Sequence, residues 1–135
     1  HYHFAPMAFR PRPVQRPRIP VWVVGAWPHV KPMRRAARWD GLVVQGTDAD
    51  GQPTNAPANL DEIVTWVTVE RMRNGLTGPY DIVVGGTTPA DDPAAAAAIT
   101  ASMAAAGATW WTEADWDTAT IGSLRARIAA GPPRA

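Results

Sequence analysis

The sequence contains no cysteine among its 135 residues. A chain without cysteine has no disulfide framework, no thiol nucleophile and no zinc site built from thiolates. An excess of charge of one sign is missing too, because 13 basic side chains stand against 12 acidic ones. The formal net charge of +1 therefore gives no reason to expect nucleic acid or an anionic membrane as the main partner.

Long, strongly apolar runs are missing as well. The longest uncharged stretch, residues 93–112, has the length of a membrane span, but it is mostly alanine and is interrupted by serine, threonine and glycine. No basic stretch followed by an apolar run opens the sequence, so no secretory signal is visible. We therefore expect a cytoplasmic protein with no membrane partner. Because the sequence begins with His1, we expect either a processed chain or a piece of a longer protein.

The composition indicates one domain that follows an extended amino-terminal segment. The hydrophobic fraction of 46% is enough for a core at this length. Residues 1–20 hold five prolines with arginines between them. Proline removes backbone donors and fixes φ, so we expect an extended segment rich in Pro and Arg there. The domain is expected to occupy residues 21–135.

This domain alternates apolar strands with helices. We expect strands at 21–25, 41–46, 80–86 and 108–113, followed by helices at 31–39, 60–74, 93–106 and 120–130. Continuous apolar runs that close on glycine or a polar turn are typical of a parallel sheet covered by helices. The sequence therefore predicts an α/β fold of four successive β/α units. A doubly wound sheet and half of a TIM (β/α)8 barrel both fit, whereas a complete barrel typically needs about 250 residues.

The helices carry further signals at their ends and faces. Asn59 is the expected N-cap of the second helix, with Glu62 as its capping-box partner. Asp92 is the expected N-cap of the alanine-rich third helix. In the last helix, Ile121, Leu124 and Ile128 recur at helical spacing, and we expect them to form a buried stripe.

Several blocks of the sequence resemble one known enzyme family. These blocks are residues 11–15, 18–25 with Pro28, 34–41, 80–86, 91–93 and 107–113. The block 34–41 reads Arg-Arg-Ala-Ala-Arg-Trp-Asp-Gly and lies in phase with the expected strands on both sides. In these blocks, and over nearly its whole length, the chain is similar to the luciferase-like monooxygenase family, the flavin-dependent relatives of bacterial luciferase.

The resemblance implies a (β/α)8 barrel of which this chain holds only the last four units, a carboxy-terminal half-barrel. It implies FMN as cofactor, with reduced flavin and O2 oxygenating a small organic substrate. The deazaflavin F420 with hydride transfer is the alternative. The missing amino-terminal half would supply much of the flavin pocket, so we expect as partner either that half or a second copy in a homo-oligomer. The alternative function is a non-catalytic half-barrel that associates with itself or with a partner chain.

The segment after the first strand is one candidate cofactor site. Glycine lets the backbone approach a ligand, and the free N–H groups of a helix start suit a phosphate, to which a lysine adds charge. The resemblance implies that the cofactor phosphate is held in this region, by Gly25, Ala26, Trp27, His29 and Lys31. The alternative is a plain strand-to-helix turn with a solvated lysine.

The ends of the third and fourth strands hold a second set of candidates. An anion could be held by Gly85, Gly86 and Thr87, which are equally compatible with a flexible turn. Trp111 and Glu113 alternate along the fourth strand and therefore share one side of it, where we expect them to contact flavin or substrate.

Two alternatives belong to this second set. Trp110 has the opposite parity to Trp111 and Glu113, so it would then face the helices. The alternative role of the Glu113 carboxylate is a structural pairing with an arginine. His29 has no partner at metal-ligand spacing, so we expect no metal site. The sequence alone identifies no catalytic residue.

Overall fold

The computed structural model describes residues 3–8, 10–12, 14–48, 50–115 and 119–132. The elements in chain order are β1 (Trp22–Ala26), α1 (Val30–Ala36), β2 (Gly41–Thr47), β3 (Pro53–Thr54), α2 (Leu60–Arg73), β4 (Asp81–Gly86), α3 (Pro93–Ala105), β5 (Trp110–Glu113) and α4 (Ile121–Ala130). The four predicted strand–helix units are therefore confirmed, and the short strand β3 lies between β2 and α2. The described residues of 3–20 form no helix or strand.

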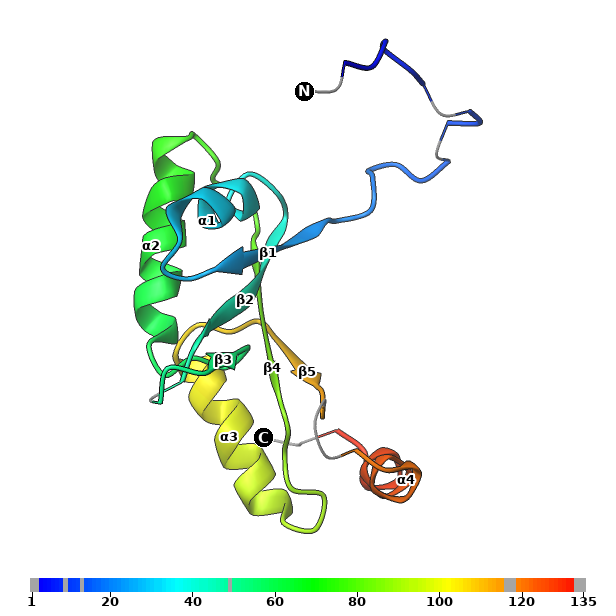
Figure 1. The fold of residues 1–135 in the computed structure, drawn as a ribbon, viewed down its shortest axis with the longest axis vertical. Coiled ribbons are helices and arrows are strands. Elements are labelled where there is room, and N and C mark those ends of the chain that lie inside the picture. The colour runs from blue at the N-terminus through cyan, green and yellow to red at the C-terminus, as the bar shows by residue number, and fades with distance from the viewer. Residues whose placement is uncertain (1–2, 9, 13, 49, 116–118, 133–135) are drawn as a thin grey trace.

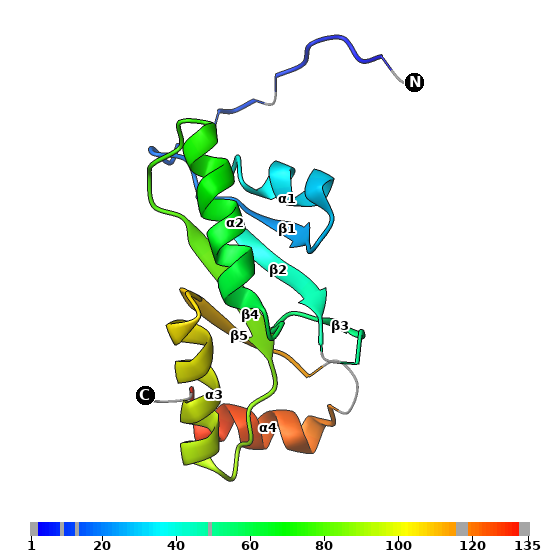
Figure 2. The ribbon, with the colours of Figure 1, turned by 90° about the vertical axis from the view of Figure 1, so that its left-hand side faces the viewer.

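The main strands form a parallel sheet. Its order is β1-β2-β4-β5, with all three pairings parallel, and β3 pairs antiparallel with β2 (Figure 1). The helices α1, α2 and α3 lie on the same face of this sheet (Figure 2). The strands follow chain order, without the reversal that a doubly wound sheet needs. This order and the one-sided helix layer match the expected half-barrel, although the sheet itself stays open.

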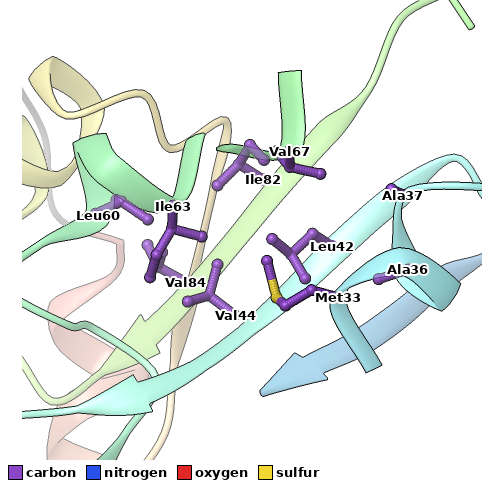
Figure 3. Packing of buried hydrophobic residues seen from close by; sticks show 10 residues of the cluster. All are labelled: Met33, Ala36, Ala37, Leu42, Val44, Leu60, Ile63, Val67, Ile82 and Val84. Atoms are coloured by element: carbon purple, nitrogen blue, oxygen red, sulfur yellow. The ribbon is translucent and has the colours of Figure 1, made fainter. Parts of the chain in front are cut away.

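The core lies between the sheet and the helix layer. Alternate residues of β2 and β4 point toward α1 and α2 because successive side chains of a strand project to opposite faces. Figure 3 shows the resulting cluster, in which the strand residues Leu42, Val44, Ile82 and Val84 meet Met33, Ala36, Ala37, Leu60, Ile63 and Val67. Burying each of the larger side chains contributes about 1.5–3 kcal/mol. Leu60, Ile63 and Val67 recur at helical spacing, which places them on one face of α2.

The predicted caps have different outcomes. The Asp92 side chain accepts a hydrogen bond from the Ala95 amide at 2.9 Å, which confirms this N-cap of α3. The predicted capping box at Asn59 is wrong: its side chain accepts no cap bond, and its amide Nδ2 instead donates to the Glu62 carboxylate at 3.0 Å. The two side chains therefore bond to each other, and the Asn59 side chain caps no backbone amide of the first turn of α2.

The face of the sheet opposite the helix layer is open. Its side chains include Trp22, Val24 and Trp110, which are 39%, 48% and 52% exposed. The expectation that Trp110 faces the helices is wrong, since the register aligns it with Val83, while Trp111 aligns with the core residue Val84. Trp111 is partly buried against the core, and this packing explains why it, and not Trp110, faces the helices.

An aspartate joins the two tryptophans of the open face. The indole Nε1 of Trp22 donates to Asp81 Oδ2 at 3.0 Å, and that of Trp110 donates to Asp81 Oδ1 at 3.1 Å. The two ring centroids lie 5.2 Å apart although the residues come from opposite ends of the strand order. Gly41 makes this possible, because a Cβ there would stand 2.5 Å from Cδ1 of Trp22.

The last helix does not join the layer formed by the other three. It lies beyond the carboxyl end of β5 (Figure 1). The predicted buried stripe is wrong, since Ile121, Leu124 and Ile128 are 74%, 47% and 79% exposed. Their spacing is amphipathic, but the described residues provide no apolar surface large enough to cover them. Within the described residues, no helix is long and apolar enough to cross a membrane.

Candidate functional site

The predicted site residues lie at one edge of the molecule. All four main strands are parallel, so their carboxyl ends meet at the same edge of the sheet. The segment 25–31 leaves this edge after β1, and the segment 85–88 leaves it after β4. Glu113 ends β5 there. The fold therefore brings the candidates from the third and fourth predicted strands together.

Glu113 is the centre of a hydrogen-bonded cluster. Its carboxylate accepts from the Thr88 amide at 2.6 Å, from the Thr88 hydroxyl at 2.9 Å and from the Trp111 indole Nε1 at 2.9 Å. The Arg127 Nε of α4 lies 3.9 Å from Oε1 of the same carboxylate. Thr88 is buried, while the Glu113 side chain is about a quarter exposed. The predicted shared side of Trp111 and Glu113 is confirmed, and both lie on the helix side of the sheet.

These contacts decide the protonation of Glu113. Partial burial raises its pKa, but the hydrogen bonds from Thr88 and Trp111, together with the charge of Arg127, outweigh burial and hold the pKa below its usual value. The side chain is therefore an anion at neutral pH. Three of its roughly four lone-pair directions already accept protein donors. It can accept a further hydrogen bond or hold a cationic group, and it is not suited to act as a general acid.

A cavity of about 550 Å³ lies beside this cluster. Its apolar walls come from Trp111, Leu124 and Ile128, and its polar groups include those of Glu113 and Arg127. Ligand sites usually have about 300–1,000 Å³, apolar walls and a few converging polar groups, and this cavity has all three features. The alternative role predicted for Glu113, a pairing with an arginine, is present in the structure, but the sequence did not identify Arg127 as the partner because that depends on where α4 lies. The only signal for it was an arginine beside the apolar stripe of the last helix.

Gly85 and Gly86 have tight surroundings of their own. A Cβ at Gly85 would lie 2.9 Å from the Thr112 carbonyl oxygen, and one at Gly86 would lie 3.0 Å from the Trp111 ring. Both glycines also line a separate hollow of about 280 Å³, together with Gln45. The Thr87 hydroxyl donates to the Ala114 carbonyl at 3.0 Å. The glycines therefore allow close strand and ring packing, and they also border open space at the carboxyl edge.

The segment after β1 splits into packing residues and solvent-facing ones. Gly25 faces the core, where a Cβ would lie 2.5 Å from Leu42 Cδ1 and 2.8 Å from Met33 Sδ. Trp27 packs on the core and meets Trp66 edge to face at 6.0 Å. His29 is exposed and starts α1 without a side-chain cap bond, while Ala26 is half-buried at the end of β1. These contacts explain the glycine and tryptophan without a ligand.

A phosphate would find few donors at the start of α1. The amides of Trp27 and His29 already donate to Gln45 and Ala26 carbonyls, at 2.7 Å and 2.8 Å. Pro32 has no N–H, so the described first turn leaves the amides of Val30 and Lys31 and the Lys31 ammonium. These three groups fit the charge of a phosphate, but they are fewer donors than the sequence pattern indicates.

The described residues contain no group of three His, Cys, Asp or Glu side chains that could hold a metal ion. Searches with the chain found no matching family model, no matching curated protein and no matching solved structure.

Proposed function

We propose that this chain is the carboxy-terminal half-barrel of a flavin-dependent oxidoreductase of the luciferase-like type. The cofactor is FMN, or F420 as the alternative, and the substrate is a small organic molecule. When bound, the cofactor supplies the electron or hydride transfer, and the protein positions it and limits access of water. The partner that completes the site is either an amino-terminal half or a second copy of the chain.

The observation that carries the proposal is the cavity beside Glu113. It lies at the carboxyl ends of parallel β/α units, which is where barrel enzymes place their active sites. Its apolar walls suit a flat aromatic ring, and Glu113 and Arg127 offer an acceptor and a donor for the polar edge of such a ring. The resemblance to the luciferase-like monooxygenase family indicates that this ring is a flavin.

The phosphate end of the cofactor is assigned to the start of α1. Lys31 and the two available amides are the groups for it, and Gly25 contributes only by letting α1 pack close to the sheet. The second candidate, Gly85 to Thr87, borders open space at the same edge and is the alternative phosphate position.

The proposal is tested by titrating the chain with FMN, riboflavin and F420 while following the quenching of cofactor fluorescence. Riboflavin has the same ring as FMN but no phosphate, so it separates ring binding from phosphate binding. We expect FMN or F420 to bind at micromolar concentration and riboflavin to bind at least tenfold more weakly than FMN. Absence of binding by all three would contradict the assignment of the cavity beside Glu113 to a flavin ring.

One observation favours a second candidate function, assembly without catalysis. The open face exposes Trp22, Val24 and Trp110, and the edge strands β1 and β5 each have one unpaired side among the described residues. Unpaired edges and an apolar face both promote pairing with another chain. A stable dimer that binds none of the three cofactors would favour this function over the oxidoreductase.

A further inference from the structure

A separate cavity of about 370 Å³ lies at the opposite end of the sheet from Glu113. It is formed where α2 ends and the chain turns into β4. Apolar side chains make most of its wall, namely Val64, Val67, Met72, Leu76 and Ile82. Two polar side chains, Arg71 and Tyr80, also line it. Neither has a part in the proposed flavin site.

Arg71 is a buried cation that makes no direct ion pair with a described carboxylate, although its charge contributes to lowering the pKa of Asp40. Only 8% of its surface is exposed, and no carboxylate of the described residues lies within ion-pair distance. Its guanidinium donates to the carbonyls of Ala37, Trp39 and Gly78 at 3.0–3.1 Å. A guanidinium has five N–H groups, so these three bonds leave two without a described acceptor. Buried charges are normally paired, and carbonyl dipoles alone compensate this one only in part.

Tyr80 adds an unused donor in the same cavity. Its ring stacks under the Arg71 guanidinium, with 4.1 Å from Cζ to the ring centroid. Its hydroxyl is buried, and no described group forms a hydrogen bond with it. Burial raises the pKa of Tyr80 to about 12 despite the nearby charge of Arg71. The phenol therefore stays protonated and is available to donate.

We propose that this cavity binds a small organic carboxylate. A carboxylate would accept from the Tyr80 hydroxyl and the remaining Arg71 N–H groups, which satisfies the orphaned donor and neutralises the buried cation. The apolar wall selects a ligand with a short hydrocarbon body over a fully hydrated anion such as inorganic phosphate. The site is independent of the flavin assignment, because the two cavities share no lining residue.

The probes for this site are hexanoate, its neutral counterpart 1-hexanol, and inorganic phosphate. Calorimetric titration of the whole chain measures the three affinities, and amide chemical shifts map where each probe binds. We expect hexanoate to bind at least tenfold more tightly than 1-hexanol and than phosphate. The shifts should appear at Thr68, Leu76 and Gly107, which line the cavity, and not at Ser123 beside Glu113.

The decisive variant is Tyr80→Phe, which keeps the ring under Arg71 and removes only the hydroxyl. Hexanoate affinity should fall about fivefold or more. Val69→Ala, on the outer face of α2, is the matched control and should bind like the original chain. Thermal melts of both variants check that they are folded. No binding, equal binding of 1-hexanol, or an unchanged affinity in a folded Tyr80→Phe would each overturn the proposal.

Discussion

The Glu113 carboxylate shows how single residues decide what this edge of the molecule can do. Three protein donors and Arg127 hold it as an anion, and the same contacts fix the loop after β4 against β5. Its residue type and position at a strand end were predictable. Its partners were not, because Thr88 is 25 residues away in sequence and Arg127 belongs to a helix whose placement no local pattern indicates.

The lowered pKa of Glu113 predicts an acid-dependent loss of stability. The folded pKa lies below the ordinary value of 4.5, so the contribution is fully present above that value and is lost as pH falls through the lowered pKa. The Tm of the original chain should therefore fall more steeply with decreasing pH, between about pH 5 and pH 3, than the Tm of Glu113→Gln. Asp40, whose pKa the hydrogen bond from Arg18 also lowers, adds a slope common to both chains. Parallel curves would contradict the assignment to Glu113.

Lys31→Glu tests the cofactor phosphate site. Lys31 is exposed at the first turn of α1, where a carboxylate suits the helix dipole, so the fold should be unaffected. Binding of FMN or F420 should weaken about tenfold or more, because attraction is replaced by repulsion. Fluorescence titration beside a circular dichroism melt separates affinity from stability. An unchanged affinity with an unchanged melt would move the phosphate to the segment 85–88.

The sequence predicted the positions of the strands and helices better than it predicted which of their faces are buried. Apolar runs closed by glycine or a polar turn located β1, β2, β4 and β5 to within a few residues, because burial on a sheet requires such runs. The prediction that Trp110 faces the helices was wrong, because Trp110 and Trp111 have the same side chain and only tertiary packing decides which of them faces the helices. The predicted buried stripe of α4 was wrong for a related reason: its helical spacing is present, but no described element covers it.

The two N-caps provide a matched test at the scale of the helix. Asp92→Ala removes an observed cap bond and should destabilise the chain by about 1 kcal/mol. Asn59→Ala removes only a bond between two exposed side chains and should cost no more than about 0.5 kcal/mol. Urea unfolding of both variants measures the two differences. Equal losses would mean that Asn59 caps α2 in solution.

The molecule as a whole has a sheet with one covered face and one open face. The covered face holds the core, while the open face exposes side chains that a closed barrel would bury. The parallel order was predictable from the alternation of strands and helices. The Trp22–Asp81–Trp110 contact was not, because it joins residues from β1, β4 and β5 across a strand without a side chain at Gly41.

Self-association is the prediction at this scale. Sedimentation of the chain should show dimers or larger species, and Val24→Lys on the open face should weaken association at least tenfold. Val69→Lys is the matched control, since Val69 is also a partly exposed valine, at 39% against 48%, but lies on the outer side of α2. A monomeric original chain with a cooperative melt at high temperature would contradict the prediction, as would equal effects of the two lysines.

The contact between Trp22 and Trp110 also has an optical consequence. Two indoles whose centroids are 5.2 Å apart at an interplanar angle of 54° are close enough for their electronic transitions to couple. Such exciton coupling splits the ultraviolet circular dichroism of the pair into adjacent bands of opposite sign. The rings belong to the first and last strands of the order β1-β2-β4-β5, so the split signal arises only when the intervening strands are in place. The chain thus carries a label-free readout of the whole sheet, on the face where a second chain would bind.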